Sequence, residues 1–277
     1  MDNEPFFTRD GAAFIPTLSS RGPWDPKSLH GRVVIGLLGA RIEALHGGPE
    51  FTPARLTVDM YRLPGLDPIT VTTRLARDGY RIKVVEAELF GAGVSMARAS
   101  CQLLRRGEPP EGRVWSPANW DAPAPDSIPP PPERPLGGMW QIRPIDGNMG
   151  SLGRRRLWMA EVRALVEGEP LTPFARAALA ADFASPFANA GDAGLGYINT
   201  DATLYLHRTP TTQWVGMEVV NHQASDGVAI GECWLYDEAG PIGTATVAAL
   251  SQGRKRIGTG TPPENAPGEG RPPSPPS

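Results

Sequence analysis

A carboxylate that could act as a general base lies where the sequence pattern predicts the packed face of a helix. Thr172-Pro173 is a typical helix start, because a hydroxyl caps free N–H groups and proline suits the first helical position. Phe174, Ala178 and Asp182 follow at spacings of four residues, which predicts a shared face. Pro186 predicts the helix end, where a nearby negative charge opposes the helix dipole. Asp182 therefore either serves chemistry or turns outward to bind the backbone of the next loop.

The composition is that of a globular protein. Of 277 residues, 40% are apolar and 21% charged, which suits one large domain or two ordinary ones. The net charge of −3 gives no indication of a nucleic-acid partner or a membrane surface. Cys101 and Cys233 lack metal-site or disulfide spacing, so we expect buried thiols and no metal ion. We find no signal segment and no apolar run of ~18 residues, so we expect a cytoplasmic protein without a membrane span.

One helix and four long strands are predicted in the first half of the chain. An apolar stripe at helical spacing indicates a helix over residues 32–45. Gly36 and Gly39 inside it indicate a close approach to another backbone, as in a helix wrapped by a sheet. Alternation and turn residues predict a short edge strand at 14–16 and strands at 55–62, 69–77, 80–90 and 94–104.

The second half repeats this order after a change in composition. Ten prolines in residues 109–137 predict an extended linker, whose Trp115 and Trp120 we expect to dock on a surface. Strands are predicted at 139–146 and 157–166, a helix at 172–185, and strands at 197–208, 213–223, 228–236 and 241–251. Beyond Ile257 no aliphatic residue is larger than alanine, which predicts disorder. The expected divisions are a first domain at 1–108, the linker at 109–137, a second domain at 138–256 and a tail at 257–277.

Three landmarks support an internal duplication. They recur 146 to 148 residues apart: Arg62-Leu63-Pro64 with Arg208-Thr209-Pro210, Asp78-Gly79 with Asp226-Gly227, and Gly93 with Gly240. A constant offset across a helix and four strands indicates that one unit occurs twice.

The duplicated unit resembles the double-hotdog acyl-CoA thioesterases, namely the thioesterase II group and the thioesterase-like proteins of actinobacteria. The stretches that carry the resemblance are HGRVVIG (30–36), ARLTVDMYRLP (54–64), AADF (180–183), DATLYLHR (201–208) and DEAGPIGTATVAAL (237–250). The resemblance covers about 12–252 without the centre of the linker. It implies an α+β fold of two tandem hotdog domains, each an antiparallel sheet wrapped around a central helix.

The resemblance also implies a catalytic set. In the thioesterase II group a helix-end Asp, a Ser or Thr at the start of the next long strand and a Gln on the last strand position a water against the thioester carbonyl. Asp182 falls on the Asp and Asn199 on the Ser or Thr; an asparagine still donates a hydrogen bond or holds a water. Ala248 falls on the Gln and does neither. Asp182 and Asn199 are therefore the predicted catalytic residues.

The start of the first helix is the predicted oxyanion and substrate-binding site. Related hotdog thioesterases carry His-Gly-Gly where this chain has His30, Gly31 and Arg32, so the second glycine is replaced. Helix N-termini supply N–H donors for a developing oxyanion. The alternative for His30 is a helix cap or a surface loop residue. The basic runs 154–156 and 254–256 would either bind coenzyme A phosphates or be solvated strand ends.

The sequence thus predicts hydrolysis of an acyl-CoA, or a related acyl thioester, to free acid and CoA, with Asp182 activating water and no cofactor. The rival prediction is a catalytically silent acyl-thioester-binding protein, which Ala248 favours. Gly-x-Ser-x-Gly and phosphate-binding glycine motifs are absent from the sequence, which disfavours an α/β-hydrolase or a nucleotide-binding enzyme. The family leads us to expect a homo-oligomer.

Overall fold

The elements of the computed structural model follow the predicted order in both halves. It describes residues 4–117, 119–131 and 140–252. The first half contains β1 (Phe7–Asp10), β2 (Ala13–Pro16), a 3-10 turn (Leu18–Ser20), α1 (Gly31–His46), β3 (Phe51–Met60), β4 (Ile69–Asp78), β5 (Ile82–Gly91) and β6 (Val94–Arg105). The tail 257–277, the end of the linker and the basic run 254–256 lie outside the described residues. Among the helices described, none has the length and apolar composition needed to cross a lipid bilayer.

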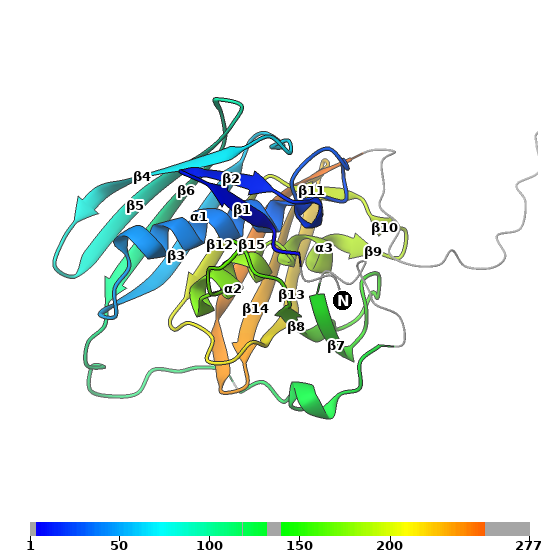
Figure 1. The fold of residues 1–277 in the computed structure, drawn as a ribbon. Coiled ribbons are helices and arrows are strands. Elements are labelled where there is room, and N and C mark those ends of the chain that lie inside the picture. The colour runs from blue at the N-terminus through cyan, green and yellow to red at the C-terminus, as the bar shows by residue number, and fades with distance from the viewer. Residues whose placement is uncertain (1–3, 118, 132–139, 253–277) are drawn as a thin grey trace, which may run out of the picture.

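The second half begins with a 3-10 turn (Pro125–Ser127) in the linker. Its elements are β7 (Trp140–Asp146), β8 (Arg156–Glu161), α2 (Pro173–Ala181), α3 (Ala184–Asn189), β9 (Ala190–Gly191), β10 (Gly194–Leu195), β11 (Tyr197–Asn199), β12 (Asp201–Leu206), β13 (Val215–Ser225), β14 (Val228–Asp237) and β15 (Gly240–Ser251). Within the described residues, one sheet of 13 strands has the order β1-β2-β4-β5-β6-β3-β12-β15-β14-β13-β8-β7, with β11 also paired to β15 (Figure 1). A tandem hotdog arrangement, the predicted fold class, is confirmed.

The two halves meet where β3 pairs with β12. Thr57 lies opposite Thr203, and the two hydroxyl oxygens are 3.2 Å apart. These residues are 146 positions apart, which is the offset of the sequence repeat. Because a residue pairs with its own counterpart, an approximate twofold axis passes between β3 and β12.

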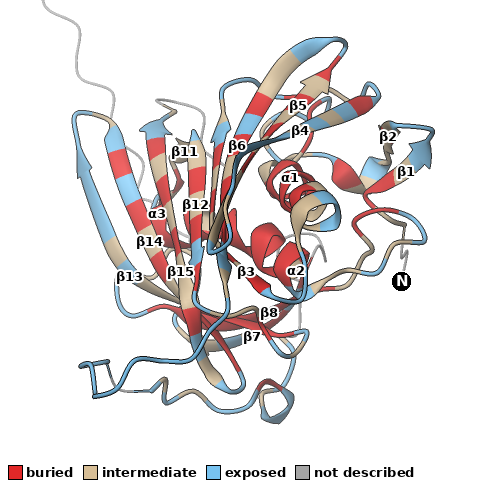
Figure 2. Ribbon diagram, turned by 90° about the vertical axis from the view of Figure 1, so that its left-hand side faces the viewer, coloured by how far each residue is buried: buried red, intermediate tan, exposed pale blue. Residues whose placement is uncertain are grey.

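The two central helices are α1 and α2. They lie side by side in the concave face of the sheet, with their buried residues facing the sheet and each other (Figure 2). A Cβ at Gly36 would come within 2.6 Å of Leu179, and one at Gly39 within 3.1 Å of Ala178. The close approach predicted from the two glycines is therefore to α2, the helix of the other half, and at Gly39 also to Leu56 of β3, at 3.3 Å. Dense packing of this kind leaves no room for larger side chains.

The predicted helix 172–185 is interrupted near its end. Thr172 caps α2 as expected, with its hydroxyl accepting the N–H of Ala175 at 3.1 Å. The helix stops at Ala181, and Pro186 lies in the first turn of α3, where a missing N–H costs no hydrogen bond. The prediction that Pro186 ends the helical structure is wrong: it belongs to a second short helix. Asp182 lies at the bend between the two helices.

The proline-rich linker packs on the outer face of the second half through one of its two indoles. Trp120 stacks on Tyr236 at 4.2 Å between ring centroids and meets the edge of Trp158 at 4.8 Å. The docking predicted for Trp120 is confirmed. Trp115 is 85% exposed, so the same prediction is wrong for it.

Asp237 at the end of β14 should make the protein sensitive to acid. Burial alone would raise the pKa of this carboxyl, but hydrogen bonds from Arg208 and Thr211 outweigh it and lower the pKa from 3.8 to about 2. A group whose pKa is depressed by folding stabilises the fold above its unfolded pKa, and that stabilisation is lost as the pH falls through the folded pKa. Between pH ~4 and ~2, the free energy of unfolding should therefore fall more steeply for the wild type than for Asp237→Asn. Urea unfolding at several pH values measures this free energy. An equal dependence on pH for the wild type and Asp237→Asn would contradict the prediction.

Candidate active site

The first turn of α1 offers a hydrogen-bond donor to the space in front of it. His30 caps the helix with an extended backbone, and its Nδ1 lies 3.2 Å from the backbone N of Arg32. The N–H of Gly31, the first helical residue, donates to no partner within the described residues. Free N–H groups and the helix dipole make this end attractive to negative charge. The start of α1 can therefore hold an oxyanion.

Asp182 faces this helix start from the end of α2. The residue is only 5% exposed, so its carboxylate does not turn outward to solvent. Its Oδ1 accepts a hydrogen bond from Asn199 Nδ2 at 3.0 Å, and its Oδ2 lies 3.3 Å from His30 Nδ1. Three of the predicted site residues from three elements are thus in one cluster.

Gly31 is required by space at this cluster. A Cβ on it would lie 2.8 Å from Asp182 Oδ1 and 3.3 Å from the carboxyl carbon. A distance below 3.0 Å is shorter than real Cβ contacts, so any other residue would displace the carboxylate. The glycine brings the helix backbone and the carboxylate within reach of one small group, such as a water or a carbonyl.

Asn199 enters the site because the predicted strand 197–208 is broken. Asn199 pairs with Ala249, whereas Thr203 pairs with Thr246, so the register shifts by one residue between them. At the break, the backbone N–H of Thr200 donates to Ala248 O and Asp201 Oδ1 accepts from Ala248 N. Burial raises the pKa of the Asp201 carboxyl. The shift turns Asn199 inward, to the face of Asp182.

The last strand supplies no polar side chain here. Ala248 pairs with Ile230 on the outer face of the sheet, where Ile230 is 39% exposed. Cross-strand partners share a face, so Ala249, opposite Asn199, is the β15 residue on the side of Asp182. Neither alanine can hold a water by its side chain.

One ring nitrogen of His30 faces two partners. Its Nδ1 is close both to the Arg32 N–H and to Asp182 Oδ2. Without a proton Nδ1 accepts the N–H, and with a proton it donates to the carboxylate, so it serves one partner at a time. The alternative of a helix cap for His30 is confirmed, and the contact with Asp182 adds to it.

The Arg32 side chain lies in the core rather than in the site. It is 1% exposed, packs between the rings of Phe6 and Trp140, and donates from Nη1 to Glu161 Oε2 at 2.8 Å. Burial lowers the pKa of Arg32 and raises that of Glu161. The ion pair fixes the first turn of α1, and the backbone N–H of Arg32 contacts His30.

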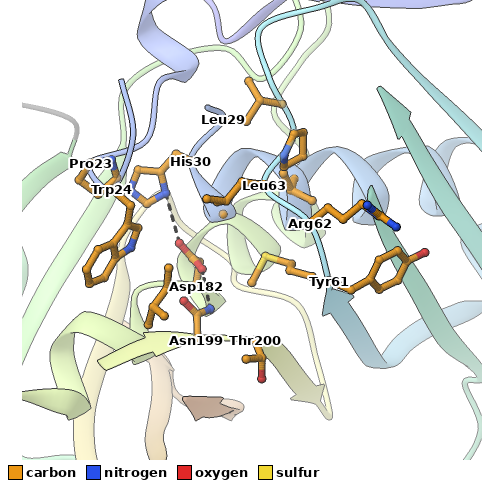
Figure 3. Close-up of a pocket in the computed structure, with 15 residues that line it drawn as sticks. Pro23, Trp24, Leu29, His30, Tyr61, Arg62, Leu63, Asp182, Asn199 and Thr200 are labelled. Carbon is orange, nitrogen blue, oxygen red and sulfur yellow. Dashed lines mark hydrogen bonds and ion pairs between the residues drawn. The ribbon is translucent and has the colours of Figure 1, made fainter. Parts of the chain in front are cut away.

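A cavity of about 210 Å³ opens in front of the cluster (Figure 3). His30, Gly31, Asp182 and Asn199 line it, but Arg32 does not. The remaining lining residues are Pro23, Trp24, Leu29, Val34, Met60, Tyr61, Arg62, Leu63, Pro64, Ile198 and Thr200. In Figure 3, Trp24 and Arg62 lie on opposite sides of the carboxylate. The cavity is therefore built by both halves, with an apolar wall and one arginine.

Sequence reasoning missed Trp24 and residues 61–64 as parts of this cavity. Trp24 lies in a loop rich in glycine and proline, where a large aromatic residue has no strand to pack in. That mismatch is the signal that could have singled it out. Residues 62–64 are the first landmark of the sequence repeat, and the approach of 61–64 to the second half requires the pairing of β3 with β12.

The basic run 154–156 is occupied by partners within the protein. Arg154 pairs with Glu218 and Arg156 with Asp146, both at 2.7 Å. Arg155 donates to the backbone oxygen of Ala190 at 2.7 Å. Arg155 and Arg156 are buried, so the predicted alternative of solvated strand ends is wrong for them and fits only the exposed Arg154.

Comparison with known families assigns both halves. A model of the acyl-CoA thioesterase N-terminal domain matches residues 20–106, and a model of the acyl-CoA thioesterase C-terminal domain matches residues 117–250. The chain belongs to the acyl-CoA thioesterase family. The second match begins within the linker and therefore includes Trp120. A search of curated proteins gave no match.

Solved structures share the fold of this thioesterase-family chain. A candidate thioesterase of Novosphingobium aromaticivorans is 20% identical with a TM-score of 0.68, covering 90% of this chain and 98% of its own. A hot dog protein of Alicyclobacillus acidocaldarius, of unknown function, is 15% identical with a TM-score of 0.67, covering 88% and 94%. Acyl-CoA thioesterase II of Mycobacterium marinum is 15% identical with a TM-score of 0.60, covering 80% and 90%.

Proposed function

We propose that the protein hydrolyses the thioester bond of an acyl-CoA and that Asp182 is the general base. The observation that carries the proposal is the buried Asp182 carboxylate, which is held by Asn199, lies against Gly31 at the start of α1 and lines the same cavity as Gly31. A carboxylate and a backbone N–H donor beside one cavity are what hydrolysis of an activated carbonyl needs.

The carbonyl oxygen of the substrate lies against the start of α1. The Gly31 N–H donates to it, and the positive end of the helix dipole stabilises the negative charge that develops on this oxygen. Hydrogen bonds aimed at a developing charge stabilise the transition state more than the ground state.

The water that attacks is held by the Asp182 carboxylate. Asp182 takes one proton as the water oxygen bonds to the carbonyl carbon, which gives a tetrahedral oxyanion. The oxyanion collapses, the carbon–sulfur bond breaks, and the thiolate of coenzyme A takes the proton from Asp182. One thioester and one water thus give one acid and one thiol, with the carboxylate restored.

Asn199 and His30 act by positioning. Asn199 Nδ2 fixes Oδ1 of Asp182 and so leaves the carboxylate in one orientation. His30 caps α1, which keeps the Gly31 N–H in place, and contacts Oδ2 of the same carboxylate. No side chain of β15 replaces the missing glutamine, so the base and the helix N–H do the chemistry without it.

Release of free thiol from short, medium, long and aromatic acyl-CoAs tests this function. Turnover of at least one member supports the hydrolase. The rival is a silent binder of acyl thioesters, favoured by the alanines at 248 and 249, and it predicts saturable binding with no thiol released from any member. We further propose a cytoplasmic location, which the free and buried Cys101 and Cys233 support, and self-association as in the family.

Arg62 is proposed to bind the phosphates of coenzyme A. It is exposed at the cavity, where a guanidinium can form charge-assisted hydrogen bonds to phosphate oxygens. Arg62→Glu should raise KM for an acyl-CoA by ~10-fold with little change in kcat, because it removes binding that ground and transition state share. The thioester of N-acetylcysteamine, which lacks phosphates, should show no such change. Arg113→Glu makes the same charge change away from the cavity and is the control. An equal rise in KM for the acyl-CoA and the N-acetylcysteamine thioester would contradict this role of Arg62.

A further inference from the structure

A second cavity lies at the other end of the two central helices. Its volume is about 260 Å³, and Glu43, Phe51, Pro53 and Pro173 are among its lining residues. It joins the start of α2 to the end of α1, whereas the first cavity joins the start of α1 to the end of α2. The approximate twofold axis between β3 and β12 therefore relates the two cavities.

The residues of the two cavities correspond. Thr172 caps α2 as His30 caps α1, and each cap contacts a carboxylate of the opposite helix. The Thr172 hydroxyl donates to Glu43 Oε2 at 2.5 Å, as His30 faces Asp182. Thr209, in the loop after β12, lines the second cavity at the repeat position of Leu63 in the first.

Two differences separate the chemistry of the cavities. Pro173 has the place of Gly31 at the start of its helix, and proline has no N–H to donate to an oxyanion. Pro53, at the repeat position of Asn199, pairs with Leu103 as Asn199 pairs with Ala249, and its side chain has no N–H that could hold Glu43. The second cavity thus keeps a carboxyl group and lacks the donor that stabilises the transition state.

We propose that this cavity is a second acyl-CoA site, which binds the thioester without hydrolysing it. The apolar walls from Phe51, Pro53 and Pro173 suit an acyl chain, and the exposed Arg106 at the cavity supplies a cation for the phosphates. Burial raises the pKa of the Glu43 carboxyl, which lessens its repulsion of an anionic ligand. The substrate class rests on the proposed function.

Binding stoichiometry of a non-hydrolysable acyl-CoA thioether tests the proposal. By equilibrium dialysis, the wild type should bind about two molecules per chain. Thr209→Trp should bind about one, and Leu63→Trp, its matched partner in the first cavity, should also bind about one. One molecule on the wild type, or two on Thr209→Trp, would overturn the second site. The wild-type value decides even if a tryptophan variant does not fold.

Turnover separates this inference from the proposed function. Two bound molecules without any thiol release would keep the second site and overturn the hydrolase. Thiol release with only one bound molecule would support the hydrolase and overturn the second site. Leu63→Trp, which closes the first cavity, should release no thiol from an acyl-CoA, and thiol release by this variant would overturn the claim that the second site does not hydrolyse.

Discussion

Asp182→Asn should lower kcat for thiol release from the best acyl-CoA by at least ~100-fold, because the amide cannot take a proton from water. The substitution keeps the size of the side chain and an oxygen that accepts from Asn199. KM should change little, since the thioester contacts the carboxylate only through the water. Steady-state assays of free thiol measure both constants, and thermal unfolding checks the fold.

Asp192→Asn is the matched control for this prediction. Asp192 is an exposed carboxylate in the turn between β9 and β10, and it does not line the cavity. Its loss should leave kcat within twofold of the wild type. A twofold change corresponds to about 0.4 kcal/mol in the activation free energy, and a surface substitution has effects of this size or less. If Asp182→Asn released thiol at the wild-type rate, the protein would still be a hydrolase, but Asp182 would not be its general base.

Glu161→Gln should destabilise the protein by ~3–5 kcal/mol, the range for breaking a buried ion pair by removing one charge. Glu161 and Arg32 have side chains that are 0% and 1% exposed, and the substitution leaves the buried guanidinium without the carboxylate that balances it. Glu161 Oε1 also accepts the N–H groups of Val162 and Arg163, which an amide oxygen retains. The expected loss is therefore mostly electrostatic.

Urea unfolding of Glu161→Gln and Glu169→Gln measures this difference. Glu169 pairs with Arg9 at the surface, where both side chains are 38% exposed, so its loss should cost ~0–1 kcal/mol. Equal destabilisation by both substitutions would contradict the role given to the buried pair. Because Arg32 follows Gly31, Glu161→Gln should also disturb the start of α1 and lower kcat.

Much of the fold could be predicted from local pattern and repetition. Alternation located the strands within a few residues, and the offset between repeat landmarks gave the duplication. The spacing of Phe174, Ala178 and Asp182 indicated an inward-facing carboxylate, which is observed. The expected domain boundaries stay a prediction, because the sheet is continuous through the pairing of β3 with β12.

The parts of the site that escaped prediction depend on contacts between distant segments. The approach of Gly31 to Asp182 follows from the packing of α1 on α2, which no local pattern encodes. The burial of the charged Arg32 could not be predicted, because its partner Glu161 is 129 residues away in the sequence. The inward turn of Asn199 results from a register shift against β15 rather than from strand alternation.

The most direct test of water activation by Asp182 is a single turnover in H₂¹⁸O, with the protein in excess over its best acyl-CoA. We predict one ¹⁸O atom in the released acid and none in the peptide that contains Asp182, both measured by mass spectrometry. If Asp182 instead attacked the thioester carbonyl, a mixed anhydride would form, and water cleaving it at the Asp182 carbonyl would leave ¹⁸O in that peptide. Label in the peptide, or acid without label, would contradict the proposed mechanism.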